Sequence, residues 1–132
     1  MLLRDFNNLE GLCMDGDVFE RLWRWAGNTR DKHKRRGFQI RISRAEIYDM
    51  AVEAMKTGCY FCGCELVLAK PGDSKCVLPD QVSLDVVNPE HRVLEPGNCR
   101  VICCSCNHGR MHMSEVDYVL KCLRVVENMM GV

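Results

Sequence analysis

Ten cysteines occur in this chain of 132 residues, and four of them form two C-x-x-C pairs, Cys59 with Cys62 and Cys103 with Cys106. Cysteine at this density indicates either disulfides in an oxidising compartment or a metal site in a reducing one. The amino terminus, MLLRDFNNLE, contains charged residues at Arg4 and Asp5, so it has no uninterrupted apolar stretch like that of a secretory signal. Together the two features favour metal, and we expect zinc in an intracellular, reducing compartment.

The two pairs can supply four thiolates, which fill the tetrahedral shell of zinc and leave no position for water. The predicted zinc site is therefore structural. The spacing leaves open which sulfurs bind, because Cys64 competes with Cys62, and Cys104 competes with its neighbours. A second site is an alternative, and it would draw on the remaining cysteines of this region, Cys64, Cys76, Cys99 and Cys104.

Charge is balanced over the whole chain but unevenly placed along it. Nine Lys or Arg and one acidic residue lie between Arg21 and Arg44, so this segment carries a net charge of +8. A segment this basic in a neutral chain predicts a face that binds a polyanion, and a solvated helix surface is the alternative. The residues expected to bind nucleic acid within it are Arg30, Lys32, Lys34, Arg35 and Arg36.

Hydrophobic periodicity predicts an α+β fold. Helices are expected over residues 17–35, 44–57, 105–113 and from 115 onward, and strands over 38–42, 65–68, 82–87 and 99–103. Residues 1–16 are predicted to be an arm, 17–58 a basic helical and strand subregion of the same domain, and 59–132 the zinc-bound core. Trp23 and Trp25 are expected in the core, as is the apolar side of the last helix, which carries Leu123.

The two cysteine pairs are separated by 40 residues, about twice the spacing of a simple zinc ribbon. The inserted segment ends as strand, turn, strand and helix, with Asp85 in the first strand and Asn98 at the start of the second. Packing the helix on this hairpin would bring Asp85 close to Asn107 and His108. A carboxylate beside an amide or imidazole forms a ligand set suited to Mg²⁺ or Mn²⁺.

The stretch SLDVVNPEHRVLEPGNCRVICCSCNHGRM resembles the core of HNH nucleases that have a zinc-stabilised ββα-metal fold of treble-clef type. It is most similar to the phage-like and mobile-element group, whose core opens S-L-D-R-I-D and continues through G-N to C-x-x-C-N. The upstream stretch RRGFQIRISRAEIYDMAVEAMKTGCYFCG extends the resemblance, which covers about residues 17 to 128.

This resemblance implies phosphodiester hydrolysis in which Asp85 and Asn107 hold a catalytic Mg²⁺ or Mn²⁺ ion. Asn98 would brace the hairpin turn, and Arg110 would meet phosphate. Fully active relatives often have histidine as the general base directly after the strand aspartate, where this chain has Val86. The nearest residues that could replace it are His91 and His108.

The expected function is thus a metal-dependent endonuclease acting on nucleic acid, with double-stranded DNA as the expected substrate. A non-catalytic nucleic-acid-binding module is the first alternative, and a zinc-stabilised protein-interaction domain is the second. Recruitment by a protein partner or larger complex is compatible with the neutral overall charge. No membrane association is expected, because no uncharged apolar run approaches the roughly 20 residues of a membrane-spanning helix.

Overall fold

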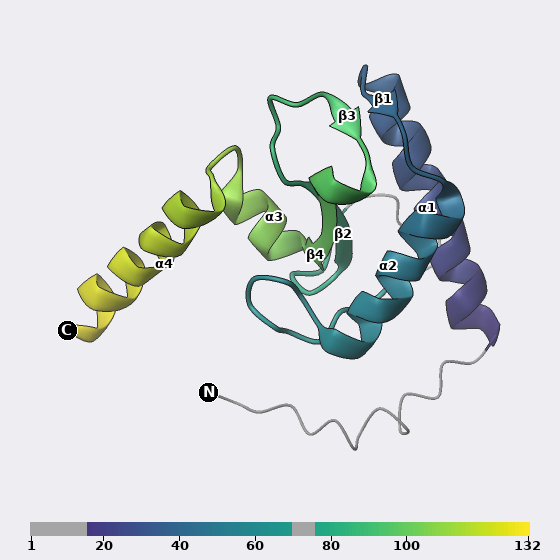
Figure 1. Cartoon of the computed structure of the whole chain (residues 1–132). Helices are drawn as coiled ribbons and strands as arrows, with labels where there is room; N and C mark the ends of the chain where they lie inside the picture. The colour runs from purple at the N-terminus through teal and green to yellow at the C-terminus, as the bar shows by residue number, and fades with distance from the viewer. Residues whose placement is uncertain (1–15, 70–75) are drawn as a thin grey trace.

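The computed structural model describes residues 16–69 and 76–132, so most of the predicted N-terminal arm lies outside the described residues. The described residues form a mixed α+β arrangement, as predicted (Figure 1). Its helices are α1 (Gly16–Arg35), α2 (Arg44–Thr57), α3 (Cys104–Arg110) and α4 (Glu115–Met130). Its strands are β1 (Gln39–Ile40), β2 (Val82–Val86), β3 (Val93–Leu94) and β4 (Cys99–Cys103), with a short 3-10 helix, η2 (Pro96–Asn98), before β4.

Helices α1 and α2 pack side by side and bury Leu22 and Ala26 against Ile47 and Ala51 (Figure 1). The start of α2 is the predicted capping box. The Ser43 hydroxyl accepts a hydrogen bond from the Glu46 amide at 3.0 Å, and the Glu46 carboxylate accepts one from the Ser43 amide at 3.1 Å. These reciprocal bonds fix the residue at which the chain enters the helix.

Strands β2 and β4 form the predicted antiparallel hairpin, in a register that places Asp85 opposite Arg100. The connection between them was predicted as a simple turn, but it contains β3, which pairs in parallel with β1. The predicted strand over residues 38–42 shortens to β1, and that over residues 65–68 reduces to one isolated bridge from Val67 to Gln81. Two-residue strands are too short to produce a clear alternating pattern in the sequence.

The position of α4 differs from the prediction. The helix forms where expected, but none of its residues is buried, and it extends away from α1 and α2 (Figure 1). Trp23 likewise is 40% exposed, although it was predicted to be in the core. Amphipathic spacing predicts a helix with an apolar side, but it does not specify that another part of the same chain covers that side.

Candidate metal centre and the adjoining pocket

The two predicted cysteine pairs meet at one point. Cys59 and Cys62 come from the loop after α2, Cys103 ends β4, and Cys106 lies in the first turn of α3. Their four sulfur atoms lie within 4.8 Å of one another, and those of Cys62 and Cys103 are 3.8 Å apart. Sulfurs at about 2.3 Å from a tetrahedral zinc are about 3.8 Å from each other. This cluster could therefore hold a metal ion such as zinc.

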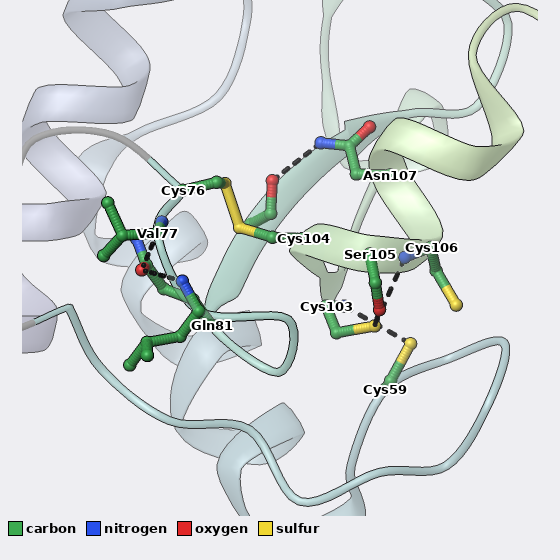
Figure 2. The surroundings of a disulfide bond; sticks show 11 residues. Cys59, Cys76, Val77, Gln81, Cys103, Cys104, Ser105, Cys106 and Asn107 are labelled. Carbon is green, nitrogen blue, oxygen red and sulfur yellow. Dashed lines mark hydrogen bonds between the residues drawn. A yellow bond between two sulfur atoms is a disulfide. The ribbon is translucent and has the colours of Figure 1, made fainter.

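Backbone and side-chain donors surround these sulfurs. The Cys103 amide donates to the Cys59 sulfur at 3.3 Å, and the Cys106 amide donates to the Cys103 sulfur at 3.4 Å (Figure 2). Burial opposes ionisation of Cys103, but hydrogen bonds from Ser105 and from the Cys106 amide outweigh it and lower the pKa of this thiol to about 7. Such donors stabilise the thiolate form that binds metal. Cys64 is not one of these four residues, but its thiol contacts Cys62 and Cys103, and burial, followed by these neighbouring thiols, raises its pKa.

Cys104 forms a disulfide with Cys76, which the sequence analysis did not anticipate. Figure 2 shows the disulfide and the clustered sulfurs on different sides of the start of α3. Cys104 therefore does not compete for the zinc position, and the alternative second site loses two of its four sulfurs. Of the others proposed for that site, Cys99 is buried and donates to the Glu95 carbonyl at 3.3 Å.

A pocket lies between the C-terminal end of α1, the β2–β4 hairpin, α3 and the start of α4. Asp85 and Asn107 both line it, so the hairpin and α3 bring these two predicted site residues to one cavity. Four arginines also line the pocket, Arg36, Arg92, Arg100 and Arg110, together with the acids Glu90 and Glu115. Positive charge thus surrounds a single deeply buried carboxylate.

Asp85 is only 1% exposed, and both of its carboxylate oxygens are engaged. Oδ2 accepts a hydrogen bond from Arg100 Nε at 2.9 Å, and Oδ1 accepts one from Arg110 Nη2. The Asn107 amide nitrogen donates to the Ser83 hydroxyl at 2.6 Å, and Figure 2 draws this bond as a dashed line from Asn107. A carboxylate and an amide oxygen suit a hard cation, but here two guanidinium groups neutralise the carboxylate.

Arg110 differs from the expectation that it meets phosphate. Its side chain is buried, and besides Asp85 it donates to the carbonyls of Val86 and Met113, each at 2.7 Å. Charge-assisted hydrogen bonds of this kind join the hairpin to the end of α3. The single-sequence pattern gave no sign of these partners, because they depend on the register of the hairpin against α3.

The histidines also differ from the expectation. Neither His91 nor His108 is among the lining residues of this pocket, and the Nε2 atom of His91 instead lies 2.9 Å from the Glu95 carboxylate. The pocket is lined by His33 and His112, to which the sequence analysis gave no role. His33 Nδ1 donates to the Thr29 carbonyl at 2.7 Å, and burial lowers the pKa of this imidazole.

The basic segment contributes to the pocket unequally. Arg36 lines the cavity, and three of the other predicted residues, Lys32, Lys34 and Arg35, are exposed near the same end of α1. Arg30 instead donates to the Ile42 carbonyl at 2.9 Å and connects α1 to the chain after β1. Arg92 was missed because it lies outside the basic run, in the hairpin connection, where it stacks on Phe38 at 4.2 Å.

Within the described residues, no helix is both long enough and apolar enough to cross a membrane. Comparison of the chain with models of protein families, with curated proteins and with solved structures found no match to any of them.

Proposed function

We propose that this chain is a zinc-stabilised, HNH-type domain of treble-clef form that binds nucleic acid and hydrolyses a phosphodiester in the pocket beside the cysteine cluster. The observation that carries the proposal is the lining of that pocket. Asp85 and Asn107, the two residues of the motif that resembles HNH nucleases, reach one cavity with Arg36 and Arg92.

Electrostatics support a phosphate ligand. Arg36 and Arg92 are exposed and line the pocket, whereas Arg110 is buried in internal hydrogen bonds. The exposed Lys32, Lys34 and Arg35 extend the positive surface along α1, beyond the pocket itself. When one phosphate of a nucleic acid lies in the pocket, its neighbours along the backbone would meet this positive surface. Double-stranded DNA is therefore the proposed partner. Binding through phosphates would depend strongly on salt concentration and would involve little base recognition.

For hydrolysis, Asp85 and Asn107 would hold a Mg²⁺ or Mn²⁺ ion, which would neutralise charge on the scissile phosphate. Arg36 and Arg92 would orient the phosphate through charge-assisted hydrogen bonds. His33 is neutral near pH 7, because burial lowers its pKa, and its Nδ1 already donates to Thr29. Its Nε2 is therefore the ring atom able to accept a proton, a role that the sequence assigned to His91 or His108.

Plasmid nicking by the zinc-loaded chain tests this proposal. We expect relaxed plasmid with Mg²⁺ or Mn²⁺, and loss of nicking in Asp85→Ala with the zinc content unchanged. Glu90→Ala is the matched control, because Glu90 is an exposed carboxylate that lines the same pocket. An intact plasmid across several divalent metals would refute hydrolysis.

A second function, binding without hydrolysis, is favoured by a specific observation. Both oxygens of Asp85 are engaged by arginine, and Val86, which cannot accept a proton, follows it. Under this alternative the wild type and Asp85→Asn would bind duplex DNA equally well. Charge reversal at Arg36 and Arg92 would weaken binding by about tenfold or more in either case, because both arginines are exposed in the pocket.

A further inference from the structure

Arg100 lies directly across the hairpin from Asp85, and its Nε donates to Asp85 Oδ2 at 2.9 Å. The position that Arg100 occupies is the one from which a divalent cation would approach that oxygen. A guanidinium group and a metal ion cannot both occupy it, because each needs the same lone pairs and they repel each other. Arg100 therefore competes with any cation for Asp85.

The guanidinium of Arg100 has a second anchorage that does not involve Asp85. It stacks on the rings of Tyr60 and Phe61, each at 4.5 Å, and its Nη1 donates to Glu115 Oε2 at 3.3 Å. The Tyr60 hydroxyl in turn donates to the other oxygen of Glu115 at 2.8 Å. The side chain of Glu115 is 48% exposed and that of Arg100 is 12% exposed, so this end of the network opens to solvent.

Arg110 is held differently. Backbone carbonyls of Val86 and Met113 fix it, and those groups move only with the hairpin and the end of α3. The partners of Arg100 other than Asp85 are side chains, which can rotate. Of the two arginines on Asp85, only Arg110 is also held by these backbone carbonyls, so we take Arg100 as the one that leaves, toward Glu115 or toward a phosphate in the pocket.

We infer that Arg100 is a positioning residue that acts as an internal cation at Asp85, keeping a divalent ion out until Arg100 moves away. Its departure exposes Asp85 Oδ2, while Arg110 continues to hold Oδ1. A phosphodiester that attracts Arg100 would therefore promote ion binding at Asp85. This inference rests on the proposed function in taking Asp85 and Asn107 as the place for the ion.

The test is Mn²⁺ binding to the zinc-loaded full chain without nucleic acid, followed by electron paramagnetic resonance. Arg100→Met keeps an unbranched side chain against Tyr60 and Phe61 but removes the charge, and we expect it to bind Mn²⁺ at least about tenfold more tightly than the wild type. Arg100→Lys, which retains a cation, should stay near the wild-type affinity. Asp85→Asn added to Arg100→Met should abolish the gain.

Arg92→Met is the matched control, because Arg92 lines the pocket without contacting Asp85. An equal gain in Arg92→Met and Arg100→Met would overturn the inference, since net charge alone would then explain it. Unchanged Mn²⁺ affinity in folded Arg100→Met would also overturn it. If Arg100→Met does not fold, Asp85→Asn provides the test. Arg100 keeps the ion away from Asp85 in the wild type, so Asp85→Asn should bind Mn²⁺ with wild-type affinity. A loss of affinity of about tenfold in Asp85→Asn would overturn the inference.

Mn²⁺ affinity and plasmid nicking separate this inference from the proposed function. A gain of affinity in Arg100→Met without nicking by any form would retain the role of Arg100 and remove hydrolysis. Nicking by the wild type, with unchanged Mn²⁺ affinity in Arg100→Met, would retain hydrolysis and remove the role of Arg100.

Discussion

Asn98 illustrates how one side chain orders a connection that has little regular structure. Its amide nitrogen donates to the carbonyls of His91 and Val93 at 2.9 and 3.0 Å, and its oxygen accepts from the Asn88 amide at 2.9 Å. The side chain is buried, so each of these bonds replaces one to water. The resemblance to HNH nucleases implied this bracing role, whereas composition and periodicity alone did not.

His33 gives the chain a pH dependence whose sign follows from burial. Burial lowers its pKa below the ordinary value of about 6.5, and the nearby charges of Arg36, Lys32 and Arg92 act in the same direction, whereas the bond to Thr29 opposes them. As pH falls through the ordinary value, the unfolded chain takes up a proton before the folded chain does. The free energy of unfolding therefore decreases as the pH decreases in that range.

We expect wild-type protein to lose more stability than His33→Gln between about pH 7.5 and about pH 6, measured by urea unfolding in excess zinc. His112→Gln is the control, because His112 is exposed, and it should follow the wild type. Identical pH dependence in the wild type and in His33→Gln would contradict this account.

At the residue scale, spacing predicted the metal cluster but not the state of Asp85. The C-x-x-C pattern specifies ligands through local geometry, so Cys59, Cys62, Cys103 and Cys106 could be named from the sequence. The partner of Asp85 depends on hairpin register, and the 15 positions that separate Asp85 from Arg100 carry no local signal of that pairing. The Cys76–Cys104 disulfide was missed for the same reason.

At the scale of elements, the long helices were predictable and the short strands were not. Helices α1 and α2 follow from apolar spacing and from a capping box, which act within a few residues. Strands β1 and β3 depend on each other, and the bonds that define them join distant parts of the chain. Contacts between distant parts of the chain also determine whether α4 is covered, so the sequence predicted this helix but wrongly placed its apolar side in the core.

Helix α4 is held near its start by Tyr118, whose ring packs edge-on against Phe61 with centroids 5.1 Å apart. An isolated helix of 16 residues is marginal in water, so α4 should depend on this anchor. We expect Tyr118→Ala to accelerate amide hydrogen exchange of α4 by about tenfold, while exchange of α2 is unchanged.

Leu123→Ser is the control for this prediction, because Leu123 is exposed on α4. It should change the free energy of unfolding by less than about 0.5 kcal/mol. Slow exchange of α4 in Tyr118→Ala would show that another contact holds the helix.

At the scale of the whole molecule, the cysteine cluster joins the loop after α2 to the hairpin and α3. Metal binding at such a cluster contributes directly to folding. We expect Cys59→Ser to lose both zinc and cooperative unfolding, and Cys122→Ser, which changes an exposed cysteine of α4, to keep both. Zinc content and urea unfolding measure the two effects, and a Cys59→Ser protein as stable as the wild type would refute the structural role of the site.

We propose that the pocket beside this cluster receives a nucleic-acid phosphodiester. The most direct measurement is a titration of the zinc-loaded full chain with a short DNA duplex, followed by amide chemical shifts in nuclear magnetic resonance spectra. We expect the largest shifts at Arg36, Arg92 and Asn107, and at least about a tenfold loss of affinity between 50 and 200 mM salt. An absence of shifts at the lower salt concentration, or shifts confined to α4, would contradict the claim.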